Sequence, residues 1–131
     1  MHWHAYAWVG NGTDRAREGE RRTTSPHFAG SPLPPMRTGD WLAKPATLIA
    51  ATFTTADAAL DWLAEQYRHH NVAFLHPDRI GPEARLELAA DLLTRGVDVQ
   101  WGEWLQAARF TTIAMICCPN RHVPHPCPAL S

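Results

Sequence analysis

The segment between Pro82 and Gly96 has the two boundary signals of a single helix. Proline suits the first turn of a helix because it has no N–H to donate, and glycine suits the left-handed residue that ends one. Between them, apolar residues recur at the spacing of one helix face: Leu86, Ala89, Ala90 and Leu93. Such a stripe has to be buried against another layer, so Leu93→Ala is expected to destabilise the fold and Arg85→Ala to do much less.

A second amphipathic pattern precedes this helix. Thr54 and Asp57 have the spacing of a capping box, and a helix is expected from there to about His69. Its inner face is expected to carry Leu60, Leu63 and Tyr67, with Ala59 and Trp62 alongside.

Strand patterns flank the two helices on both sides. Residues 2–9 alternate between two faces, and residues 48–53 are apolar and β-branched. After the helices, residues 97–101 alternate and Gly102 suggests a bulge. Residues 109–117 are apolar on both faces near their end, which predicts a central strand.

The order β-β-α-α-β-β favours an α+β fold, with a mainly antiparallel sheet of about four strands and two helices packed on one face. A chain of 131 residues, 45% of them hydrophobic, suits one domain over residues 1–131. Residues 10–40 lack an apolar period and are rich in turn formers, which predicts a mobile loop. Residues 119–131 are proline-rich and are expected to form an extended tail.

The net charge of the chain and its N-terminal residues indicate where the protein is located and which partners it is expected to lack. The formal net charge is −1, so no large field attracts nucleic acid or an anionic membrane. The N-terminus has no secretory leader and no stretch is long enough to span a bilayer, which predicts a soluble, cytoplasmic protein without a membrane contact.

The densest group of potential metal ligands lies at the C-terminal end. Its members offer sulfur and imidazole donors, which tetrahedral zinc prefers: Cys117, Cys118, His122, His125 and Cys127. The spacing matches neither paired CxxC motifs nor a zinc finger, so the signal is one of composition. The competing interpretation is a buried thiol at a strand end, followed by a disordered tail.

A second candidate group lies on one face of the first strand: His2, His4, Tyr6 and Trp8. Imidazoles two residues apart on a strand project from the same face, so His2 and His4 could complete a metal site. An exposed amphipathic stripe is the favoured interpretation, because no third ligand is set by the sequence. With the arginines of the adjacent loop, this face also allows a weak single-stranded nucleic-acid binder.

These features favour a non-catalytic binding or regulatory domain, with another protein as the expected partner and no small-molecule ligand identified. The alternative is a small zinc- or thiol-dependent enzyme that uses the C-terminal cluster. An enzyme is disfavoured and no catalytic residue is predicted, because no pattern combines a nucleophile, a base and an oxyanion donor. Nucleic acid is the least favoured partner.

Overall fold

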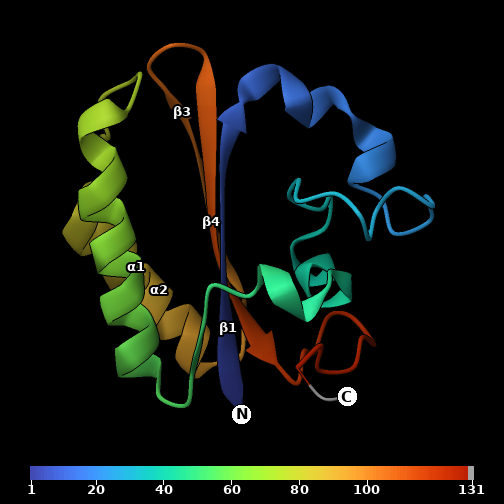
Figure 1. Ribbon diagram of the computed structural model, residues 1–131. Coiled ribbons are helices and arrows are strands. Elements are labelled where there is room, and N and C mark those ends of the chain that lie inside the picture. The colour runs from blue at the N-terminus through green and yellow to red at the C-terminus, as the bar shows by residue number, and fades with distance from the viewer. Residues whose placement is uncertain (130–131) are drawn as a thin grey trace.

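The computed structural model describes residues 1–129 and contains one four-stranded antiparallel sheet, in the order β2-β1-β4-β3 (Figure 1). Its strands are β1 (His2–Asn11), β2 (Ala51–Phe53), β3 (Val99–Leu105) and β4 (Arg109–Cys118). The long strands β1 and β4 lie in the centre, as predicted for β4, and pair along their whole length. The predicted α+β class and element order are therefore confirmed.

Two helices, α1 (Ala56–His70) and α2 (Pro82–Thr94), cover one face of the sheet (Figure 1). The α1 cap is Thr55, whose hydroxyl accepts a hydrogen bond from the Ala58 N–H at 3.2 Å, and not the predicted Thr54. The α2 boundaries agree with the sequence signals, because Pro82 opens the helix and Gly96 has a φ of 76° just after its end.

The core beneath the helices is built from one face of each element. Ala59 and Leu63 from α1, with Ala89 and Leu93 from α2, are buried against the sheet, whereas Leu60 and Leu86 are only partly buried. Side chains alternate along a strand, so one face of β1 and β4 completes this core: Trp3, Ala5, Ile113, Met115 and Cys117. Arg85 is not an outward-facing residue, since its side chain is 10% exposed and pairs with Asp78 and Glu103.

The opposite face of the sheet is covered by a second layer. The chain between β1 and β2, which contains short 3-10 turns, and the C-terminal tail lie on this side (Figure 1). Trp41 stacks on Tyr6 with ring centroids 4.8 Å apart, and Leu42, Ala114, Ile116 and Val123 are buried around them. Both faces of the sheet are therefore packed.

One lysine holds much of the segment that is expected to be mobile. The Lys44 Nζ donates to the carbonyl oxygens of Phe28 at 2.7 Å, Ser31 at 2.8 Å and Glu20 at 3.3 Å. It also lies 3.9 Å from the centre of the Phe28 ring. The side chains of Phe28 and Leu33 are buried, which connects this part of residues 10–40 to the fold. Whether residues 10–40 are mobile stays a prediction, which hydrogen exchange can test.

The bulge suggested at Gly102 does not occur. Gly102 pairs with Thr112 and the register between β3 and β4 continues without a break on both sides. The Phe110 ring instead packs against Gly102. A Cβ atom at this position would lie only 3.0 Å from Phe110 Cζ. The glycine makes room for an aromatic neighbour.

Within residues 1–129, none of the helices has the length and apolar character needed to cross a membrane.

Candidate metal centre

Four nitrogen and sulfur side chains meet where β1 begins and β4 ends. His2, His4, Cys118 and Cys127 each offer one ligand atom, and these atoms all lie within 4.8 Å of one another. The register explains three of them, because His2 pairs with Cys118 and His4 lies two residues along on the same face. The tail brings Cys127 to this face from beyond the strand. The site thus joins the two ends of the described chain.

Three of the distances between the donor atoms can be compared with the edges of a tetrahedral metal shell. His2 Nε2 lies 3.1 Å from His4 Nε2, and Cys127 Sγ lies 3.3 Å from His4 Nε2 and 3.6 Å from His2 Nε2. A tetrahedron with Zn–N of about 2.1 Å and Zn–S of about 2.3 Å has edges of roughly 3.3–3.8 Å. The three distances among His2, His4 and Cys127 are therefore close to these edges, and the Cys118 Sγ atom lies within 4.8 Å of the other three donors.

The second nitrogen of His4 is also accounted for. His4 Nδ1 lies 2.8 Å from Thr52 Oγ1, on the neighbouring strand β2. When Nδ1–H donates to this hydroxyl, the lone pair of Nε2 points into the group of donors. Burial, with the nearby His2, lowers the pKa of His4 and favours the neutral ring that metal binding requires.

The two cysteines differ in exposure. Cys118 is 3% exposed, whereas Cys127 is partly exposed on the tail. Burial, with hydrogen bonding and charge from Cys127, raises the pKa of Cys118 to about 11. The protonated thiol is therefore the stable form in the absence of a cation. A bound zinc ion reverses this preference, because it stabilises the thiolate directly.

A buried hydroxyl beside these thiols has no hydrogen-bond partner among residues 1–129. Tyr6 is fully buried, and its Oη finds no acceptor. Burial, with the nearby Cys118 and Cys127, raises the pKa of Tyr6, so its hydroxyl keeps its proton and needs an acceptor. A metal-bound thiolate is a much better acceptor than a thiol. The Tyr6 hydroxyl is thus a buried donor without an acceptor among residues 1–129.

The remaining predicted ligands lie elsewhere. Cys117 faces the helices, on the opposite side of the sheet from Cys118, and burial raises its pKa to about 12. His125 Nε2 bonds to Asp40 Oδ1 at 2.8 Å, and the His122 backbone N–H donates to Asn120 Oδ1 at 2.9 Å. Of the predicted C-terminal cluster, the structure therefore brings only Cys118 and Cys127 into the group, with His2 and His4 in place of the tail histidines.

The expectation that the first-strand face is an exposed stripe is wrong. His4 is 1% exposed and Tyr6 is fully buried, because Trp41 and the tail cover them. Trp8 is partly buried at the edge of the same cluster. This face does not offer a free aromatic platform to a ligand.

Asp40, which the sequence patterns did not single out, anchors the C-terminal tail near the candidate metal centre. Its side chain is 5% exposed and accepts hydrogen bonds from Arg37 at 3.1 and 3.2 Å as well as bonding to His125. Arg37 and His125, despite the burial of the carboxylate, lower the pKa of Asp40. No local pattern signals this contact, because Asp40 and His125 are far apart in the chain.

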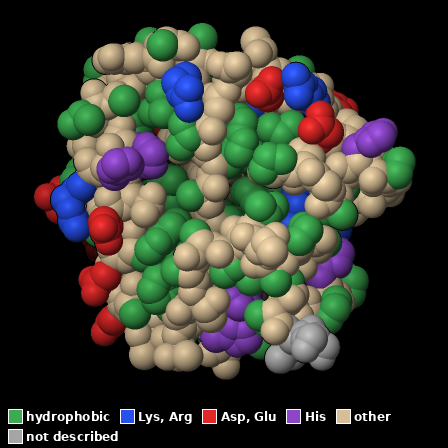
Figure 2. All heavy atoms as spheres, in the orientation of Figure 1, with side chains coloured by type: hydrophobic (Ala, Val, Ile, Leu, Met, Phe, Trp, Pro, Cys, Tyr) green, Lys and Arg blue, Asp and Glu red, His purple; other side chains and the backbone are tan. Residues whose placement is uncertain are grey.

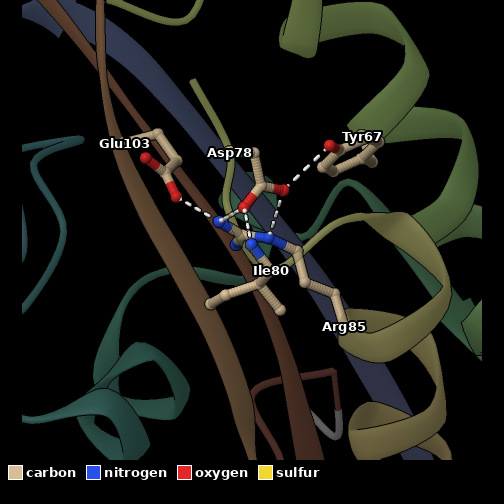
Figure 3. Close-up of polar contacts among 5 residues, drawn as sticks. All are labelled: Tyr67, Asp78, Ile80, Arg85 and Glu103. Carbon is tan, nitrogen blue, oxygen red and sulfur yellow. Dashed lines mark hydrogen bonds and ion pairs between the residues drawn. The ribbon is translucent and has the colours of Figure 1, made fainter. Parts of the chain in front are cut away.

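A second polar cluster lies between the helices and β3 (Figure 3). Asp78 accepts hydrogen bonds from Tyr67 Oη at 2.8 Å, Arg85 Nε at 2.9 Å and the Ile80 N–H at 3.0 Å, while Arg85 also pairs with Glu103. The Arg85 guanidinium lowers the pKa of Asp78 to about 2. Because the Arg85 guanidinium pairs with two carboxylates from different segments, we interpret the cluster as an anchor for the α1–α2 connection.

Comparison with known proteins found no match to a family model, to a curated protein or to a solved structure. The chemistry of the four-donor group therefore carries the functional argument.

Proposed function

We propose that this protein is a non-catalytic binding domain with a structural zinc site. His2, His4, Cys118 and Cys127 would hold the ion through two imidazole nitrogens and two thiolates. The observation that carries the proposal is the spacing of these donor atoms, all within 4.8 Å of one another. Imidazole and thiolate together suit zinc better than calcium or magnesium, which prefer oxygen ligands.

The number of protein ligands favours a structural role over an enzymatic one. A catalytic zinc ion usually has three protein ligands and keeps its fourth position for water or substrate. Here four donors are available, which would fill a tetrahedral shell. The zinc-enzyme alternative therefore has less support than a closed site.

A metal ion at this site would link two parts of the fold that are distant in the sequence. It would join the first strand to the tail, which is irregular after Cys118 and includes Cys127. The free energy of metal binding would then add directly to the free energy of folding. With the tail fastened, the domain would present a defined surface to another protein, which remains the expected partner class.

The nucleic-acid alternative has little support. Figure 2 shows basic and acidic side chains in small groups on the face that it draws, with apolar side chains between them. A net charge of −1 supplies no general attraction to phosphate. Tyr6 stacks on Trp41 within the fold, so it is not available to stack on a base.

Elemental analysis of untagged protein tests the proposal. We expect one zinc ion per chain, together with the strong visible absorption of tetrahedral cobalt–thiolate when cobalt replaces zinc. His4→Ala and Cys118→Ala should each abolish stoichiometric binding. The matched controls His122→Ala and Cys117→Ala should retain the metal, because these side chains lie outside the donor group. Metal-free wild-type protein, or full occupancy in His4→Ala, would contradict the proposal.

A further inference from the structure

Two of the three cysteines lie side by side at the candidate metal centre. The Sγ atoms of Cys118 and Cys127 are within 4.8 Å of each other, and no disulfide joins them. The third cysteine, Cys117, is fully buried in the core on the opposite face. The site therefore contains one pair of neighbouring thiols from which the remaining thiol is separated by the sheet.

We propose that Cys118 and Cys127 are a peroxide-sensitive pair, and that formation of a disulfide between them expels the metal ion. The inference rests on the proposed function, since it concerns the regulation of the same site. A disulfide needs its sulfur atoms at about 2.0 Å, so the two atoms have to approach each other. Cys118 ends a central strand, whereas Cys127 lies on the irregular tail and can make this movement.

Hydrogen peroxide supplies the oxidising equivalents. The more exposed Cys127 thiolate attacks one peroxide oxygen, the O–O bond breaks, and a sulfenic acid and hydroxide form. The Cys118 thiolate then attacks the sulfenic sulfur, the S–S bond forms and a second hydroxide leaves. The two sulfurs together lose two electrons and the peroxide gains two, and the two hydroxide ions take up protons from the buffer.

Loss of both thiolates would remove half of the metal's ligands. A disulfide sulfur is a poor ligand, because the thiolate is the form that binds metal. His2 and His4 would remain, and two imidazoles leave a tetrahedral ion with two open positions for water. The zinc ion is therefore expected to dissociate, and reduction of the disulfide to restore its site.

The test uses the full-length, zinc-loaded protein treated with hydrogen peroxide. A chromogenic chelator records zinc release, while intact mass and non-reducing peptide mapping identify the oxidation product. We expect one zinc ion released for each Cys118–Cys127 disulfide formed, with recovery of zinc binding after treatment with a thiol reductant. The control Cys117→Ala should behave as the wild type does.

The other possible results distinguish failure of the redox inference from failure of the proposed zinc site. Zinc release with sulfinic acid but without the disulfide, a disulfide that includes Cys117, or retention of zinc after oxidation would each overturn the inference while the metal site stands. Protein that binds no zinc before treatment would overturn the proposed function, and metal release with it. Peptide mapping of such metal-free protein would still show whether Cys118 and Cys127 pair.

Discussion

His4 Nδ1 and Thr52 Oγ1 lie 2.8 Å apart across the β1–β2 pair, which directs His4 Nε2 toward the two cysteines of the candidate metal centre. Hydrogen bonds of this kind orient a histidine ligand and select its tautomer. The exposed Thr52 on the short strand β2 thus orients a histidine of a site whose donors come from β1, β4 and the tail.

Substitution of Thr52 is expected to weaken metal binding without abolishing it. Thr52→Val removes the acceptor for Nδ1–H and should lower zinc affinity roughly 10- to 100-fold. Thr52→Ser should restore most of it, and Thr54→Val serves as the control because Thr54 makes no such contact. Competition with a zinc chelator measures the affinities. Equal affinity in Thr52→Val and wild type would refute this role.

Removal of the metal is expected to loosen the tail. After chelation, the amides of residues 119–129 should exchange faster, and the midpoint of thermal unfolding should fall, since the ion binds only the folded site. Adding zinc should reverse both changes in wild-type protein but not in His4→Ala. Hydrogen exchange and calorimetry provide the measurements. A tail that keeps its protection without metal would show that contacts such as His125 with Asp40 suffice.

Leu93→Ala is expected to destabilise the domain by about 2–5 kcal/mol, because Leu93 is fully buried beneath α2. Leu88→Ala is the matched control, since Leu88 is 59% exposed on the same helix and should change stability by less than about 0.5 kcal/mol. Urea unfolding measures both. Similar small losses in the two variants would show that the inner face of α2 is misassigned.

Because of the Asp78–Arg85 pair, the free energy of unfolding should depend on pH in the acidic range. The pKa of Asp78 falls from 3.8 to about 2 in the folded state, so its contribution is present above the unfolded value and is lost as the pH drops through the folded value. The advantage of wild type over Asp78→Asn should therefore shrink between about pH 4 and pH 2. Denaturant unfolding at several pH values tests this. Asp91→Asn, at an exposed ion pair, is the control and should show a much smaller effect.

Lys44→Met should destabilise the segment around Phe28 and Ser31, because three carbonyl oxygens lose a charged donor. The expected loss in the free energy of unfolding is roughly 2–3 kcal/mol, against little change for the exposed Arg68→Met. In wild-type protein, the Met36 amide, which donates to Arg21 at 2.8 Å, should be protected from exchange. Rapid exchange there would support the mobility that composition predicts for residues 10–40.

The sequence by itself determined the elements that local forces control. Pro82 and Gly96 bound α2 because their backbone restrictions act within a few residues, and alternation along residues 2–9 predicted β1 because side chains on a strand alternate whatever lies beyond them. For the same reason the successive residues Cys117 and Cys118 of β4 lie on opposite sides of the sheet. Element order then sufficed for the fold class.

Tertiary structure alone decided that both faces of the sheet are covered and which potential ligands lie together. Trp41 and Leu42 bury the second face from a short 3-10 turn, so their contribution has no period that a sequence can display. His2 lies opposite Cys118 through a strand register between distant segments, and Cys127 reaches them through the path of a tail without regular structure. Pairing and path depend on packing across the whole chain, which is why local patterns identified the donor types but not which of them lie side by side.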